Sequence, residues 1–147
     1  ITEYFVIKMI PVPMTPTGPD MDIVEKAVAE DASIKGIWCV PKYSNPQGIV
    51  YSDAVVRRMA KLKPAAKDFR IFWDNAYAVH HLYKEKCKIR NILHECEEAD
   101  NPSLAFEFAS TSKITFAGGG IAAIACNNAN RQELKKTMTV QTIGYDK

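Results

Sequence analysis

The sequence lacks the features that mark several large classes of protein. No apolar run approaches the ~20 residues of a membrane span, and no charged and then apolar leader opens the chain. The four cysteines form no C-x-x-C pair, which argues against a metal or disulfide framework. The net charge of +2 is small and the lysines are scattered. We therefore expect a cytoplasmic protein with no metal site, no nucleic-acid partner and no membrane contact.

The composition that is present suits a globular domain. Hydrophobic residues make up 47% of the 147-residue chain and charged residues 24%, which is ordinary for a soluble protein with its own core. The chain begins with Ile1 rather than Met, and "ITEYF" resembles the end of an element that has already begun. We therefore expect this sequence to be a piece of a longer protein.

Apolar runs that are typical of strands alternate along the chain with amphipathic segments that are typical of helices. The pattern predicts strands over residues 6–14, 34–41, 69–77, 103–110 and 120–127, and helices over residues 21–31, 53–63, 88–100 and 130–138. Such alternation predicts an α/β fold, with a mostly parallel sheet and helices on both faces. The aromatic residues inside the strands are expected in the core: Trp38, Phe72, Trp73, Phe106 and Phe108.

Three polar clusters follow predicted strands directly. They are "PKYSNPQG" after "IKGIWCV", "DNAY" after "RIFW" and "STSK" after "LAFEFA". Each cluster alone is most simply a turn or a helix cap. In open α/β sheets, however, ligands bind beyond the carboxyl ends of the strands, and these clusters fall at three successive ends. The sequence therefore predicts a binding site at this edge.

The residue types in these clusters fit pyridoxal phosphate. This cofactor needs a lysine amine for a Schiff base, an acid beside its ring nitrogen, donors for its phenolic oxygen, and hydroxyls for its phosphate. The clusters supply Lys113 as the amine, Asp74 as the acid, Asn45 and Tyr77 as the donors, and Ser110 and Ser112 as the hydroxyls.

The order "NPQG", "DNAY", "STSK" resembles the large domain of the fold-type I pyridoxal-phosphate enzymes, the class I/II aminotransferases. The segments "GIWCVPKYSNPQG", "FRIFWDNAYAVHHL" and "ASTSKITFAGGG" are most similar to the MocR-like, or alanine–glyoxylate aminotransferase-like, subgroup. The resemblance implies a homodimeric aminotransferase that acts on an amino acid and a 2-oxo acid. It implies catalytic roles for Lys113, Asp74 and Tyr77, with Lys113 as Schiff-base lysine and proton shuttle, and a loop around Asn45 shaped by Pro46 and Gly48.

Two departures from this family pattern matter. Many aminotransferases carry a phosphate-binding arginine eight residues after the lysine, where this chain has Ile121, so we expect the amides of Gly118–Gly120 to contribute. Residues 1–147 also correspond only to part of the cofactor-binding large domain, without its N-terminal segment and without the C-terminal small domain. A missing strand would lie between residues 7–13 and 36–41. We therefore expect an inactive isolated chain that associates or leaves its N-terminal strand displaced.

Other functions remain open at this point. The same fold serves as the effector-sensing domain of MocR-type transcription regulators, and only the upstream sequence would distinguish that role from an enzyme. "GGGIAA" fits the dinucleotide fingerprint G-x-G-x-x-A, but a predicted strand follows it and Glu133 comes too early for the ribose-binding acid. His80 and His81 are neighbours, so we expect one to be packed and the other exposed.

Overall fold

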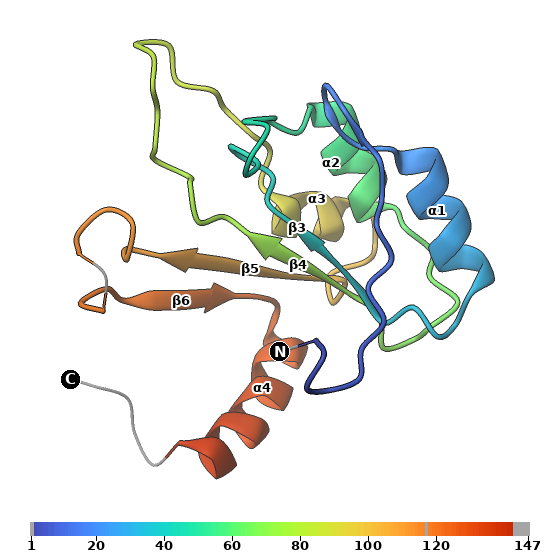
Figure 1. Ribbon diagram of the computed structural model, residues 1–147. Coiled ribbons are helices and arrows are strands. Elements are labelled where there is room, and N and C mark those ends of the chain that lie inside the picture. The colour runs from blue at the N-terminus through green and yellow to red at the C-terminus, as the bar shows by residue number, and fades with distance from the viewer. Residues whose placement is uncertain (1, 117, 143–147) are drawn as a thin grey trace.

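A four-stranded sheet forms the centre of the computed structural model, which describes residues 2–116 and 118–142 (Figure 1). Its strands lie in the order β3 (Gly36–Cys39), β4 (Arg70–Asp74), β5 (Ala105–Ser110) and β6 (Ala122–Ala125). β3 and β4 pair parallel, as do β4 and β5, whereas β6 pairs antiparallel with β5. The predicted α/β fold with a mostly parallel sheet is confirmed.

All four predicted helices are present. They are α1 (Met21–Glu30), α2 (Asp53–Ala60), α3 (Ile92–Glu98) and α4 (Asn128–Gln141). Each begins after a polar side chain that accepts hydrogen bonds from the first free backbone amides, and these caps are Asp20, Ser52, Asn91 and Asn127. The cap at Asn91 explains why α3 begins at Ile92 rather than at residue 88.

One face of the sheet is closed by α1, α2 and α3, which lie together beside it (Figure 1). Side chains alternate between the two faces along a strand, so Ile71 and Trp73 of β4 point to the same face. Both are at most 1% exposed and belong to one cluster with Val56 and Met59 of α2 and Ile92 of α3. We call this the closed face.

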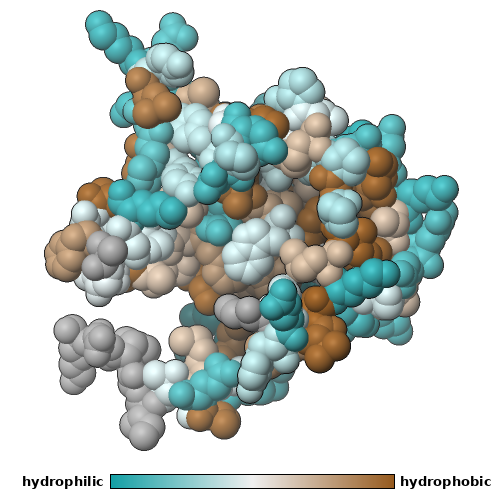
Figure 2. Space-filling model, in the orientation of Figure 1, coloured by the Kyte–Doolittle hydropathy of each residue, from teal (hydrophilic) through white to brown (hydrophobic). Residues whose placement is uncertain are grey.

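The opposite face, which we call the open face, carries a row of aromatic rings: Trp38, Phe72, Phe106 and Phe108. The rings of Trp38 and Phe72 are stacked with centroids 5.8 Å apart and planes 8° apart. Within the described residues no helix buries Trp38, which is 62% exposed, so its predicted place in the core is wrong. Figure 2, which has the orientation of Figure 1, shows exposed apolar surface across the middle of the molecule.

The strand predicted over residues 6–14 is not formed. Residues 7–13 lie outside any helix or strand, and only β1 (Met14–Thr15) pairs, antiparallel with β2 (Gly18–Pro19). A strand needs a neighbour to satisfy its backbone N–H and C=O groups, and no described strand lies beside this segment. As expected, residues 7–13 do not pair with β3, and the side chains of Ile7, Met9 and Ile10 stay exposed.

Candidate functional site

Three loops leave the carboxyl ends of the parallel strands at one edge of the sheet (Figure 1). Residues 40–52 follow β3, residues 75–91 follow β4, and residues 111–121 join β5 to β6. These loops contain the three predicted polar clusters. The parallel pairing therefore collects the predicted site residues along the edge at which open α/β sheets bind ligands.

Lys113 lies in a loop whose two ends are fastened to each other. The amide of Thr111 donates to the carbonyl of Ile121 at 2.9 Å, and the Ile121 amide donates to Thr111 Oγ1 at 2.8 Å. Gly120 returns so close that a Cβ atom there would lie 2.7 Å from the Ser112 backbone nitrogen. Glycine is needed at this position because any side chain would push Gly120 and Ser112, at the two ends of the loop, apart.

The amine of Lys113 contacts the phenol of Tyr77, the last residue of the "DNAY" cluster. Lys113 Nζ donates to Tyr77 Oη at 2.8 Å and lies 4.6 Å from the centre of the Tyr77 ring. The two residues are 36 positions apart in the chain. The fold thus joins two of the predicted clusters through direct contact between their reactive side chains.

Asp74 is the last residue of β4 and stands three residues before Tyr77. The following amide, that of Asn75, donates to the Phe108 carbonyl at 2.9 Å and fixes the strand end against β5. In the part of the chain that the structure describes, the half-buried Asp74 carboxylate has no hydrogen bond and no ion pair. Its negative charge is therefore available to a ligand at this edge.

Ser110 and Ser112 flank the junction between β5 and the Lys113 loop. Their hydroxyl oxygens are 2.8 Å apart, and the Ser112 amide donates to Ser110 Oγ at 3.1 Å. Both side chains face the same short turn. They can present two hydroxyl donors to one anion, and their assignment to a phosphate stays a prediction.

Asn45 lies in a loop after β3 that is held by its own hydrogen bonds. The Ser44 hydroxyl donates to the Val40 carbonyl at 2.9 Å, and the Gly48 amide donates to the Ser44 carbonyl. Gly48 has φ +71°, a conformation that suits glycine, and the peptide bond before Pro46 is cis. Asn45 is exposed, and among the described residues its side chain makes no hydrogen bond to Tyr77 or Lys113.

Sequence reasoning missed the part that both histidines play at this edge. His80 Nε2 lies 3.1 Å from the Lys113 carbonyl oxygen, and His81 Nδ1 lies 2.7 Å from Tyr43 Oη. Both histidines are half-buried, so the expectation that one would be packed and the other exposed is wrong, and each ring makes a contact between loops. Partial burial lowers the pKa of His81, and the nearby charges of Lys42 and Lys86 lower it further.

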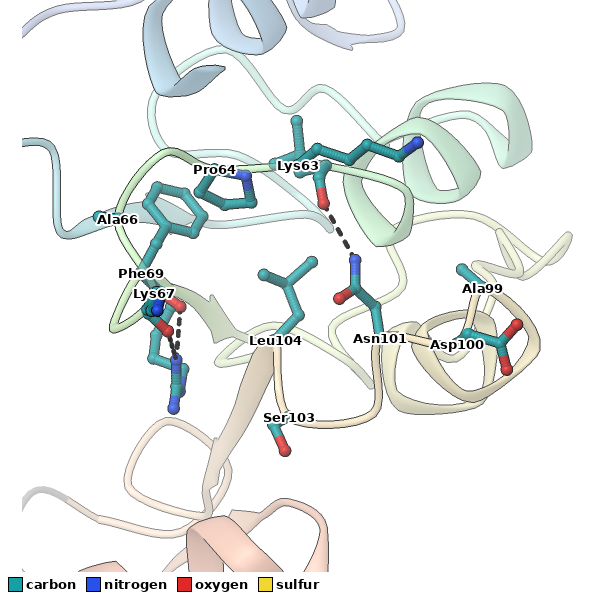
Figure 3. A pocket seen from close by; sticks show the side chains of 12 residues that line it. Lys63, Pro64, Ala66, Lys67, Phe69, Ala99, Asp100, Asn101, Ser103 and Leu104 are labelled. Atoms are coloured by element: carbon teal, nitrogen blue, oxygen red, sulfur yellow. Dashed lines mark hydrogen bonds between the residues drawn. The ribbon is translucent and has the colours of Figure 1, made fainter. Parts of the chain in front are cut away.

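A hollow in the described residues lies away from these loops. It has a volume of about 440 Å³ and opens at the amino ends of β4 and β5, next to Phe69 and Leu104 (Figure 3). Asn101 closes one side by donating to the Leu62 carbonyl at 2.9 Å. Because this hollow is at the opposite end of the strands from Lys113, it does not belong to the site.

Neither a metal-binding cluster nor a membrane-spanning helix occurs among the described residues. No group of three His, Cys, Asp or Glu side chains there is arranged to hold a metal ion. None of the described helices is long and apolar enough to cross a membrane.

The parallel sheet, the antiparallel β6 and a lysine-bearing loop at the strand ends define part of the large domain of a fold-type I aminotransferase. Comparison with known families agrees, since residues 1–147 match the aspartate amino-transferase family over their whole length. The chain belongs to this family. Aminotransferases use pyridoxal phosphate, the cofactor that the residue types had indicated.

Individual relatives support the same assignment. A Mycolicibacterium smegmatis protein described as an aminotransferase is 49% identical over 100% of this chain and 34% of its own length. The aspartate aminotransferase of Corynebacterium glutamicum is 43% identical with the same coverage. The crystal structure of a C. glutamicum aspartate transaminase superposes with TM-score 0.92 over 97% of this chain and 34% of that chain.

A Corynebacterium diphtheriae structure described as an aminotransferase gives a TM-score of 0.94 at 42% identity, over 99% of this chain and 36% of that one. The chain therefore spans about a third of the length of the relatives that it matches. The fold of this third is closely shared with them.

Proposed function

We propose that the full-length protein is an aminotransferase that moves an amino group between an amino acid and a 2-oxo acid, with pyridoxal phosphate held covalently by Lys113. The observation that carries this proposal is the 2.8 Å hydrogen bond between Lys113 Nζ and Tyr77 Oη, which lies close to the end of β4, where Asp74 is the last residue. Membership of the aspartate aminotransferase family supports it. The proposed activity is that of the full-length protein, because this chain spans only about a third of the length of its relatives.

The residues at this edge fit the cofactor by their chemistry. An aldehyde needs a primary amine, which Lys113 offers, and a pyridinium nitrogen needs an anion, which Asp74 offers with no competing partner in the described residues. Tyr77 and Asn45 would face the phenolic oxygen, and Ser110 and Ser112 the phosphate. The close return of Gly120 onto Ser112 fixes the loop that carries Lys113.

When bound, the cofactor supplies an electron sink for charge that develops at the substrate α-carbon. The residues of this chain do the rest. The Asp74 carboxylate keeps the ring nitrogen protonated by its opposite charge. The Lys113 amine would move the proton at the α-carbon, and the Tyr77 phenol would orient that amine through their 2.8 Å hydrogen bond.

The proposal includes a homodimer for the full-length protein, with amino acid and 2-oxo acid substrates. Family resemblance supports this assembly, and the aspartate aminotransferase relative supports the substrate class. The open face adds a physical reason for further contacts, because it exposes Trp38 beside three half-buried phenylalanine rings, and exposed apolar patches often mark surfaces that another part of a molecule covers.

Borohydride trapping tests the assignment of Lys113. We expect reduction of the cofactor-loaded full-length protein to fix the cofactor to the peptide that contains Lys113, as detected by mass spectrometry. The Lys113→Arg variant should lose this label, whereas Lys84→Arg in the neighbouring loop should keep it. A label on Lys42 or Lys84 in the unaltered protein would show that another lysine holds the cofactor.

A further inference from the structure

The two adjacent histidines, His80 and His81, connect all three loops of the site. Both lie in the loop after β4. His80 Nε2 lies 3.1 Å from the carbonyl oxygen of Lys113 in the loop after β5. His81 Nδ1 lies 2.7 Å from Tyr43 Oη in the loop after β3. One short segment therefore contacts its neighbours on both sides.

The contact of His80 fixes which ring nitrogen carries the proton. A carbonyl oxygen only accepts hydrogen bonds, so His80 Nε2 must be the donor. His80 Nδ1 is buried and has no partner among the described residues, so the bond to Lys113 is the only one that this ring makes there. Its loss would release the ring from the Lys113 loop altogether.

The turn that contains Tyr77 and His80 therefore contacts Lys113 twice, once at its side-chain amine and once at its main-chain carbonyl. Tyr77 Oη accepts from the amine at 2.8 Å, while His80 donates to the main-chain carbonyl. Tyr77 and His80 are themselves linked, because the His80 amide donates to the Tyr77 carbonyl at 3.1 Å and the two rings meet edge to face at 5.6 Å. A long lysine side chain has much rotamer freedom, and anchoring its backbone narrows the region that the amine can reach.

His81 extends this arrangement to the loop of Asn45. Partial burial and the positive charges of Lys42 and Lys86 lower the pKa of His81 and favour its neutral ring. Neutral Nδ1 then accepts a hydrogen bond from Tyr43 Oη, two residues before Asn45. The Tyr43 and His81 rings also meet edge to face at 6.0 Å.

We propose that His80 is a positioning residue that holds the main chain of Lys113 so that the amine rests against Tyr77, while His81 ties the same segment to the Asn45 loop. This inference rests on the proposed function of Lys113. It assigns His80 no contact with substrate or cofactor. The His80 side chain acts through the carbonyl of Lys113 alone.

Reactivity of Lys113 in the cofactor-free, full-length protein tests this role without any turnover. The protein is methylated with formaldehyde and cyanoborohydride, and the label on Lys113 is compared by mass spectrometry with that on Lys135 of α4. We expect His80→Ala to raise the relative labelling rate of Lys113 by about threefold to tenfold, the range that corresponds to one lost hydrogen bond. Tyr77→Phe, which removes the acceptor directly, should also raise it.

Two matched variants separate positioning from general loosening. His80→Gln places an amide donor near the former Nε2 and should return the labelling rate toward that of the unaltered protein. His94→Ala, at an exposed position of α3, should leave it unchanged. An equal rise at Lys113 and Lys135 in His80→Ala, or no recovery in His80→Gln, would contradict the proposal.

The outcomes also distinguish this inference from the proposed function. If borohydride fixes the cofactor to Lys113 while His80→Ala leaves Lys113 labelling unchanged and Tyr77→Phe raises it, only the role of His80 is wrong. If no variant alters the labelling rate of Lys113, its contacts with Tyr77 and His80 do not control the reactivity of its amine, and the inference fails. If borohydride fixes the cofactor to a different lysine, the proposed function itself fails.

Discussion

The two tryptophans of this chain lie on neighbouring strands and on opposite faces of one sheet. Trp73 in β4 is 1% exposed beneath α1, α2 and α3, and Trp38 in β3 is 62% exposed. Where β3 pairs with β4, Trp73 lies opposite Cys39 and Trp38 lies opposite Phe72. Trp38 and Cys39 are consecutive residues of β3 and point to opposite faces of the sheet. One face of this sheet is thus part of the hydrophobic core, and the other face is exposed at Trp38.

This difference shows that stacking and burial contribute separately. On the closed face Trp73 meets Tyr51 edge to face at 5.6 Å, and both are shielded from water. On the open face Trp38 also has a ring neighbour, Phe72, but its outer side meets water. Removal of apolar area from water gives most of the stabilisation, and a ring pair adds only about 0.5–1.5 kcal/mol beyond it.

The largest predicted effect is on the closed face. We expect Trp73→Ala to lower the free energy of unfolding by about 3–5 kcal/mol, because it empties a fully packed site between sheet and helices. Urea unfolding of the 147-residue chain, followed by circular dichroism, measures the loss. Trp38→Ala is the matched variant on the open face, and an equally large loss there would remove the distinction between the two faces.

The next effect concerns Asp74, which directly follows Trp73 in β4. Asp74→Asn keeps the shape of the side chain and removes its charge, so the ring nitrogen of the cofactor would lose a charge-assisted partner worth about 1.5–3 kcal/mol. We expect kcat of the full-length protein to fall by about one to two orders of magnitude while the melting temperature stays unchanged. An unaltered kcat would remove Asp74 from the proposed mechanism.

A smaller effect on stability is expected at Asn101, in the loop between α3 and β5. Asn101 donates to the carbonyl of Leu62 (Figure 3) and to that of Ala60, and so satisfies backbone acceptors at the end of α2. Asn101→Ala leaves these acceptors without that donor and should cost about 1–2 kcal/mol in urea unfolding. Asn101→Asp tests the cause, because it keeps the size but cannot donate, and should be no more stable than Asn101→Ala.

The closed face follows from local sequence, which is why it could be predicted. Asp20 and Ser52 directly precede α1 and α2, are residue types that cap helices, and accept amide hydrogen bonds there. The runs of β3, β4 and β5 are mostly apolar, and the one charged residue in the interior of β5, Glu107, accepts a hydrogen bond from Asn75 Nδ2 at 3.0 Å. Parallel pairing of such strands then brings the "DNAY" and "STSK" clusters to one edge, which explains the contact of Tyr77 with Lys113.

The remaining features depend on contacts that a local pattern does not encode. Residues 6–14 have the composition of a strand, but pairing requires a neighbour that is not among the described strands. Trp38 sits in an apolar run, and only the elements packed over it decide whether it is buried. The contact of His80 with Lys113 depends on the path of the loop between β4 and α3, although two adjacent histidines after "DNAY" were a visible signal.

The smallest effect on stability is expected on the open face, where the comparison can be tested by association instead. Trp38→Ser removes an exposed ring, so the free energy of unfolding of the 147-residue chain should change by less than the ~1 kcal/mol of a ring pair. Exposed aromatic rows promote association, and Trp38→Ser should therefore lower the apparent mass of the chain in sedimentation velocity at high concentration. In the full-length protein the same substitution should cost more stability than in the chain alone, because there the remaining two thirds of the molecule can cover this face. An equal cost in both would show that the open face stays exposed in the complete protein.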